Sequence, residues 1–214
     1  YTFPEDLVVK KDYLPHTKYA TIDVKENIEL IYNRYLNSVH HLDTQHKRIF
    51  DFLEQEELMD DTIIIITGDH GEEFMEAGRW GHNSEFHQDQ IRVPMILHIP
   101  GEKALQYNEM SSHLDMPAIL GPYLGIENPS ADYSLGKNLL GDERREFTVI
   151  SSWNNIGFVG KKGKVEISLS NAFDLGNRVT SIDDKAVSEQ QREEIEKDPL
   201  VFKMIKDLST FLKK

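Results

Sequence analysis

An aspartate and a histidine stand side by side at Asp69 and His70, directly after the most hydrophobic short run of the chain. A carboxylate oxygen and an imidazole nitrogen at neighbouring positions suit Zn²⁺ or Mn²⁺. A glycine on each side of the pair lets the backbone turn sharply around both side chains. Glu72 and Glu73 follow, and we expect their carboxylates to orient the histidine from behind.

An ordinary turn is the alternative interpretation of this stretch, with the Asp69 carboxylate bonded to nearby backbone N–H groups and His70 merely exposed. The position of the pair favours the metal site. Ligand-binding groups of open α/β sheets gather beyond the carboxyl ends of the strands, and "TIIII" immediately precedes the motif.

A second histidine, His82, lies twelve residues beyond His70 in the stretch "GRWGHNS". The segment between them carries no element signal of its own, and such long loops are more often functional than connecting. We expect His82 to reach the metal or a bound anion, with Asn83 donating a hydrogen bond. The alternative is a helix start capped at Asn83 or Ser84, which is compatible with the first interpretation.

The remaining histidines have structural interpretations. His40, His41 and His46 lie on or beside the apolar stripe of a predicted helix, and His87 and His98 are expected to be structural. His113 and Asp115 are expected to fix a helix start rather than to bind metal.

The elements that must position these residues follow from the hydrophobic pattern. Apolar residues recur at helical spacing over residues 24–57, and Asp23 with Glu26 forms a plausible capping box at the start of that helix. "DDTIIIITGD" and "RVPMILHIPG" are apolar on both alternating faces, which is typical of strands covered on both sides. Helix, strand, loop and strand together predict an α/β sheet layered by helices.

The C-terminal half contains weaker signals. A short helix is predicted from Asp115 to Gly121, and residues 146–170 are interpreted as two strands joined at 160–163. Residues 188–214 are predicted to be helical, with a new helix beginning at Pro199. We predict one domain over residues 1–214; a boundary, if one existed, would fall near 130–145.

Composition excludes several classes of protein. The chain has 214 residues and a formal net charge of −13, without a basic run that could follow a nucleic-acid backbone, so no nucleic-acid partner is expected. Cysteine is absent, which removes disulfides and thiolate sites. H-E-x-x-H, G-x-S-x-G and P-loop motifs do not occur. No membrane-spanning run or signal peptide is present, so the chain is expected to be soluble as given, and its opening without methionine suggests a piece of something longer.

The motifs occur in a specific order: Asp-His-Gly-Glu, then Gly-His, then Val-Pro before a strand and Pro-Gly after it, then Ser-His-x-Asp. In this order, residues 28–170 resemble the C-terminal half of the sulfatase branch of the alkaline phosphatase superfamily. The resemblance is greatest to membrane-anchored, periplasm-facing sulfatase-like proteins of Gram-negative inner membranes, relatives of lipoteichoic acid synthase. It implies an alkaline-phosphatase-like layered sheet with helices on both faces, of which this chain is a C-terminal fragment.

The resemblance also implies a metal-dependent hydrolase or transferase that acts on sulfate or phosphate esters. Asp69 and His70 match the family's ligands of a divalent cation (Mn²⁺, Zn²⁺, Mg²⁺ or Ca²⁺), and His82, beside Asn83, matches the histidine that faces the anionic group. The implied partner is an anionic ester substrate, with a lipid head group as one candidate. The implied location is the periplasmic face of the inner membrane.

The chain departs from the family pattern in one respect. The Cys/Ser-x-Pro-x-Arg signature is missing, and without cysteine no formylglycine can form. In the family, the nucleophile and the other acidic ligands belong to the N-terminal half, so we assign no catalytic residue here. The fragment is expected to bind metal weakly, to catalyse nothing alone, and to need the missing N-terminal half as its partner.

Two alternatives stay open. The parent protein is either an enzyme or a sulfatase-like domain with a binding or regulatory role at the inner membrane. A different, dinuclear metallophosphatase is the third possibility, but the further Asp, Asn and His motifs that it needs at other strand ends are not found.

Overall fold

The computed structural model describes residues 3–16, 18, 21–83, 85–169 and 177–211. Two compact units are present: residues 1–84 with 92–104, and residues 85–91 with 105–214. The chain passes between these units at 84–85, 91–92 and 104–105. The organisation into one domain stays a prediction, and each unit is described by itself.

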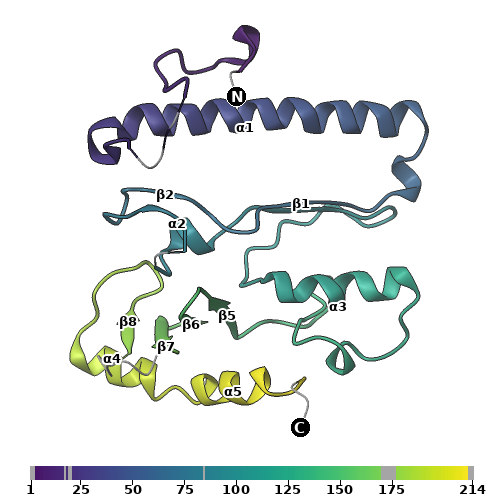
Figure 1. Cartoon of the computed structure of the whole chain (residues 1–214). Coiled ribbons are helices and arrows are strands. Elements are labelled where there is room, and N and C mark those ends of the chain that lie inside the picture. Colours follow the sequence, from purple (N-terminus) through teal and green to yellow (C-terminus); the bar gives the residue numbers. More distant parts are fainter. Residues whose placement is uncertain (1–2, 17, 19–20, 84, 170–176, 212–214) are drawn as a thin grey trace. The chain divides into compact units, whose positions relative to one another are not determined.

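The first unit is dominated by α1, the helix Val24–Gln55, which Figure 1 shows as one uninterrupted coil. It confirms the predicted helix. The Asp23 side chain caps its start by accepting a hydrogen bond from the Glu26 backbone N–H. Asn37, fully buried on α1, accepts from the backbone N–H groups of Val9 and Lys10 at 3.0 and 2.8 Å. These bonds fasten the irregular N-terminal segment to the helix.

Strands β1 (Ile64–Thr67) and β4 (Met95–His98) form a two-stranded antiparallel sheet in which Ile64 pairs with His98. Both strands are confirmed, but the predicted cover on both sides is wrong for these residues, since neither strand has a buried residue and Ile96 of β4 is 60% exposed. Within the described residues β1 pairs along one edge only, and its isoleucines are half-buried rather than fully buried.

The segment between His70 and His82 is not a loop without structure, as its sequence suggested. It contains β2 (Glu73–Phe74) and β3 (Trp80–Gly81), which pair antiparallel as a small hairpin. Two-residue strands are too short for alternating hydrophobicity to reveal them. The centroid of the Phe74 ring lies 5.0 Å from that of Tyr32 and 4.9 Å from that of Tyr35. The hairpin therefore packs against α1.

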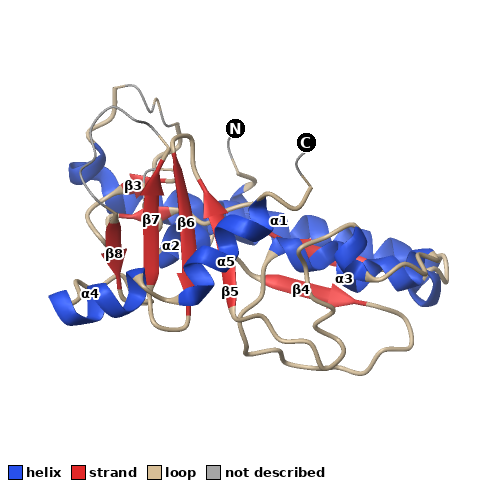
Figure 2. Cartoon of the chain, turned by 90° about the horizontal axis from the view of Figure 1, so that it is seen from below, coloured by secondary structure: helices blue, strands red, loops and turns tan. Residues whose placement is uncertain are grey.

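The second unit contains a four-stranded antiparallel sheet in the order β5-β6-β7-β8 (Figure 2). The strands are Phe147–Ser151, Asn155–Gly160, Lys164–Ser168 and Arg178–Thr180. The predicted hairpin through residues 160–163 is confirmed, since β6 and β7 pair on either side of it. The stretch before it, however, is two strands rather than one, because the chain turns at residues 152–154.

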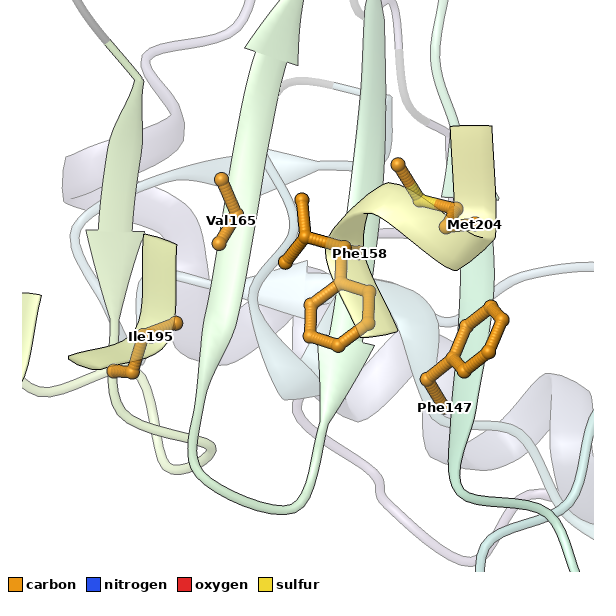
Figure 3. Close-up of a cluster of buried hydrophobic side chains, with 6 residues drawn as sticks. Phe147, Phe158, Val165, Ile195 and Met204 are labelled. Carbon is orange, nitrogen blue, oxygen red and sulfur yellow. The ribbon is translucent and has the colours of Figure 1, made fainter. Parts of the chain in front are cut away.

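Two helices pack against this sheet: α4 (Glu189–Glu196) and α5 (Pro199–Leu208). Figure 3 shows how Ile195 of α4 and Met204 of α5 meet the strand residues at the centre of a buried apolar cluster. The members of that cluster are Phe147, Phe158, Val165, Ile195, Val201 and Met204. Asp198 caps α5 and Pro199 occupies its first turn, which confirms the predicted helix start.

The connecting segments contain short helices. These are α2 (Gln88–Ile91), α3 (Met116–Leu120) and the 3₁₀ turns Glu5–Leu7, Met59–Asp61, His113–Asp115, Gly121–Leu124 and Ser130–Asp132. Ser112 and Asp115 form a capping box at the start of the 3₁₀ turn His113–Asp115, which leads directly into α3, so Asp115 fixes a helix start as predicted. Among the described residues, no helix has both the length and the apolar character that crossing a membrane requires.

Candidate metal and anion site

The site begins where β1 ends. Gly68 follows the strand directly, and a Cβ there would lie 3.3 Å from the backbone oxygen of His70 and 3.4 Å from a methyl group of Val93. A larger residue would therefore crowd the turn that presents Asp69 and His70.

The Asp69 side chain is 90% exposed, and one of its carboxylate oxygens accepts a hydrogen bond from the His70 backbone N–H at 3.1 Å. The pKa of this carboxyl lies below its usual value, because its own backbone N–H and then that of His70 stabilise the charged form. Asp69 is therefore ionised at neutral pH, as a metal ligand must be. The alternative interpretation, an ordinary turn, predicts the same hydrogen bond from the His70 backbone N–H to Asp69. This bond therefore does not distinguish a turn from a metal site.

The ring of His70 has a defined tautomer. Its Nδ1 lies 2.9 Å from the Gly71 backbone oxygen, and a carbonyl oxygen can only accept, so Nδ1 carries the proton. Nε2 is then the ring nitrogen that can bind a cation, and it lies 3.6 Å from the second carboxylate oxygen of Asp69. Two ligands of one Zn²⁺ ion, with bonds of about 2.0–2.2 Å, place their donor atoms about 3.0–3.5 Å apart. The pair therefore fits a divalent cation with little movement.

His82 lies against His70. The two rings stack with their centroids 4.0 Å apart and an angle of 28° between their planes. The β2–β3 pairing of Glu73 with Gly81 brings the following residue, His82, back to the Asp-His motif, and Gly81 adopts the left-handed φ of +94°. The Nδ1 of His82 lies 2.7 Å from a carboxylate oxygen of Glu72.

A group of three side chains is the result. His70, Glu72 and His82 each offer one ligand atom, and these atoms lie within 4.8 Å of one another. The sequence assigned Asp69, His70 and His82 to the site; His70 and His82 belong to this group, whereas Asp69 lies beside it, with a carboxylate oxygen 3.6 Å from Nε2 of His70, and its role as a ligand stays a prediction. The structure adds Glu72 as a neighbour of His82, where the sequence suggested a supporting role for His70.

Two predicted neighbours have other positions. Asn83 has a left-handed φ of +62°, and among the described residues its side chain has no hydrogen bond with the histidines. Glu73 is fully buried beneath the hairpin, where it accepts from the backbone N–H groups of Ala77 and Arg79 at 3.1 and 2.9 Å. Its role is therefore to shape the hairpin turn rather than to orient His70. The alternative of a helix cap at Ser84 lies outside the described residues, and the next helix begins at Gln88.

Histidines expected to be structural have structural contacts. His98 has its Nε2 3.3 Å from the Met59 backbone oxygen. His87 is buried, with its Nε2 2.9 Å from the Glu85 carboxylate. Neither belongs to the group around His70.

A family model described as Sulfatase matches residues 6–126, which is more than half of the chain. The chain belongs to the sulfatase family. The predicted membership of the sulfatase branch of the alkaline phosphatase superfamily is thereby confirmed, and its members are metal-dependent enzymes of sulfate and phosphate esters. The sulfatase motifs at Asp69 and His82 lie inside the matched range.

Two curated relatives and one solved structure illustrate what this chain is similar to. It is 28% identical over 114 residues to the inner membrane protein YejM of Salmonella typhimurium, covering 52% of this chain and 19% of that protein. It is 28% identical over 141 residues to the lipoteichoic acid synthase-like YvgJ of Bacillus subtilis, covering 60% and 22%. The phosphonate monoester hydrolase of Agrobacterium radiobacter superimposes with a TM-score of 0.70 at 17% identity, covering 87% of this chain and 43% of that one.

The similarity to solved structures confirms the predicted fold, an alkaline-phosphatase-like arrangement of which this chain is a part. The chain spans about a fifth of the length of the curated relatives that it matches.

Proposed function

We propose that this chain supplies one half of the active site of a metal-dependent sulfate- or phosphate-ester hydrolase or transferase. The observation that supports it is the placement of the Asp69 carboxylate 3.6 Å from Nε2 of His70, beyond the end of β1, with His82 stacked on the same ring. Asp69 and His70 would hold a divalent cation. His82 would face the anionic group of the ester, with Asn83 beside it.

Each side chain has a distinct task in this proposal. A divalent cation held there would neutralise charge on an ester oxygen as a Lewis acid. The ionised Asp69 contributes negative charge to the cation, and the Gly71 carbonyl keeps the Nε2 lone pair of His70 available. His82 would donate its Nε2–H to the anion when both of its ring nitrogens carry protons. We assign no nucleophile to this chain, which contains no cysteine, and expect one from the part of the domain that it does not include.

We propose a stripe of exposed apolar residues on α1 as the surface that the N-terminal half of the domain packs against. One stripe of α1 carries large apolar side chains that are 41–55% exposed in this chain: Tyr32, Tyr35, Val39, Leu42, Ile49 and Phe52. Ile96 of β4 is 60% exposed. We propose that the N-terminal half of the same domain covers this stripe, and that the chain alone binds metal weakly and lacks activity.

The substrate and the location are finer proposals. One relative is an inner membrane protein and another is lipoteichoic acid synthase-like, and this supports our proposal that the site works at the periplasmic face of an inner membrane. We therefore propose an anionic ester of an envelope lipid head group as the substrate class.

The test uses the protein at its full encoded length, stripped of metal and reloaded with Mn²⁺, Zn²⁺, Mg²⁺ or Ca²⁺. Cleavage of p-nitrophenyl sulfate, p-nitrophenyl phosphate and a phosphonate monoester would be measured for the wild type, Asp69→Ala and His82→Ala. We expect both variants to lose most activity, and Asp69→Ala to lose metal affinity as well. His98→Gln is the matched control, because that histidine contacts the Met59 carbonyl outside the site.

A non-catalytic binding or regulatory domain is the alternative. It predicts no cleavage of any ester by the full-length protein with any of the four metals. Unchanged cleavage in Asp69→Ala and His82→Ala would instead show that the activity lies elsewhere in the protein.

A further inference from the structure

We propose that Glu72 is a positioning residue that fixes the imidazole of His82, so that Nε2 of this ring faces the bound anion and donates its N–H to it when both ring nitrogens carry protons. The proposal rests on the function proposed above for His82. It assigns Glu72 to the histidine of the later Gly-His motif, ten residues away in the sequence, and not to the neighbouring His70.

The first argument is the hydrogen bond itself. Nδ1 of His82 lies 2.7 Å from the Glu72 carboxylate, within the range of charge-assisted N–H···O bonds. An ionised carboxylate only accepts, so Nδ1 must donate. The opposite nitrogen, Nε2, has no hydrogen-bond partner in the part of the chain that the structure describes.

The second argument is that the hairpin holds both partners. β2 begins directly after Glu72 and β3 ends directly before His82, so the Glu73–Gly81 pair sits beside the Glu72–His82 contact. The buried Glu73 carboxylate stabilises the hairpin turn by accepting hydrogen bonds from the backbone N–H groups of Ala77 and Arg79. The contact is therefore a product of the backbone register and not of two freely moving side chains.

The third argument concerns what fixes the ring. Stacking on His70 at 4.0 Å restrains the plane of the His82 imidazole. It does not decide which ring edge points outward, because the torsion that flips an imidazole is broad and roughly two-fold. Among the contacts of this ring with described residues, the bond to Glu72 is the one that separates the two flipped orientations. Removing its acceptor would let Nε2 and Nδ1 exchange places at the anion.

Direct coordination of the cation by Glu72 is the competing role, since its carboxylate lies within 4.8 Å of the ligand atoms of both histidines. Glu72→Gln separates the two roles. The amide oxygen of glutamine still accepts from Nδ1 and can keep the ring oriented, whereas a neutral amide is a much poorer ligand than a carboxylate. A positioning role therefore predicts that Glu72→Gln preserves metal affinity and ring orientation, and that Glu72→Ala loses the orientation.

The test is a two-bond ¹H–¹⁵N spectrum of the histidine rings in the full-length protein, at a pH where the imidazoles are neutral. The His82 signals are identified by their loss in His82→Gln. We expect the Nδ1–H tautomer in the wild type and in Glu72→Gln, and a mixture of tautomers in Glu72→Ala. Glu76→Ala is the matched control: it lies in the same hairpin, and its carboxylate accepts from the Phe74 backbone N–H, not from His82.

Two results would overturn the proposal. One is an unchanged His82 tautomer in Glu72→Ala. The other is a loss of metal affinity in Glu72→Gln equal to that of Glu72→Ala, which would make Glu72 a ligand. In ester cleavage we expect Glu72→Ala to lower kcat/KM about 10- to 100-fold, with Glu72→Gln restoring most of it. If His82→Ala leaves cleavage intact, the proposed function fails while the spectrum still reports on the Glu72–His82 pair.

Discussion

Asp115 and Arg145 form a buried ion pair in which both carboxylate oxygens accept from the guanidinium group. Asp115 is fully buried and Arg145 is 7% exposed. The same carboxylate accepts from the backbone N–H groups of Ser112 and Lys137 at 2.8 Å each. One side chain thus ties together three segments of the second unit.

Removing either partner leaves a buried charge without compensation. We expect Arg145→Met to lower the free energy of unfolding by about 3–5 kcal/mol, measured by urea denaturation. Arg144→Met is the matched control, because the neighbouring guanidinium bonds to backbone oxygens at Gly141 and Glu143 on the surface. Equal stability of the two variants would contradict this role of the ion pair.

Lys164, at the start of β7, is a second buried charged residue with a partner of opposite charge. Its ammonium group is buried, donates to the Phe86 backbone oxygen at 2.7 Å and pairs with Asp184. Asp184 in turn accepts from the Gln88 backbone N–H at 2.8 Å. We expect Lys164→Met to destabilise the protein by about 3 kcal/mol and to speed hydrogen exchange at the Gln88 amide.

Lys161→Met provides the comparison for that prediction, since Lys161 is exposed at the β6–β7 turn. If exchange at Gln88 responds equally to both substitutions, Lys164 does not hold this segment.

Tyr107 gives a prediction for alkaline pH. Burial raises the pKa of its hydroxyl above the ordinary 10.0, and this oxygen has no hydrogen-bond partner among the described residues. A raised folded-state pKa means that the stability is complete below about pH 10 and falls as the pH rises through the folded value. Tyr107→Phe should remove this loss and stabilise the protein at pH 7 by up to about 1 kcal/mol.

Thermal unfolding between pH 8 and pH 11 would check the Tyr107 prediction. Tyr123→Phe is the control, because the side chain of Tyr123 is exposed. A wild-type pH profile that Tyr107→Phe does not flatten would speak against it.

Substitutions at Asn83 distinguish two roles for this residue: allowing the left-handed backbone conformation next to His82, or binding substrate through its side chain. Its φ of +62° is a conformation that asparagine and glycine tolerate and β-branched residues resist. We expect Asn83→Gly to retain stability and Asn83→Val to lose about 1–2 kcal/mol. The predicted hydrogen bond to substrate is tested in the same variants: a higher KM in the stable Asn83→Gly would support it, and an unchanged KM would reduce Asn83 to a turn residue.

Local signals in the sequence predicted the elements that they directly encode. The Asp23 cap, the Asp198-Pro199 start of α5 and the turn between β6 and β7 each depend on residues adjacent in sequence, and the structure confirms all three. The turn at residues 152–154 was missed although the serines and asparagines of "SSWNN" are a loop signal, because the stronger glycine signal at residues 160–163 predicted a single turn in this stretch.

Contacts between residues far apart in the sequence could not be predicted from it. Nothing in the spacing of Asp115 and Arg145 indicates that they meet, since thirty residues separate them. Glu72 was correctly identified as a residue near the site, yet its partner depends on a hairpin of two-residue strands that hydrophobic periodicity cannot detect. The half-burial of β1 likewise depends on what covers the strand and not on its own isoleucines.

The strand order of the second unit has a consequence for folding kinetics. Every strand in the β5-β6-β7-β8 meander pairs with the next strand along the chain, so its ladder forms by closing short segments. β1 must instead find β4 across the 27 residues 68–94, since Thr67 at the end of β1 pairs with Met95 at the start of β4. Because contacts of low sequence separation cost less chain entropy, we expect the meander to fold early and the sheet that carries Asp69 to follow. The element that presents the proposed metal ligands would then be among the last to acquire its native register.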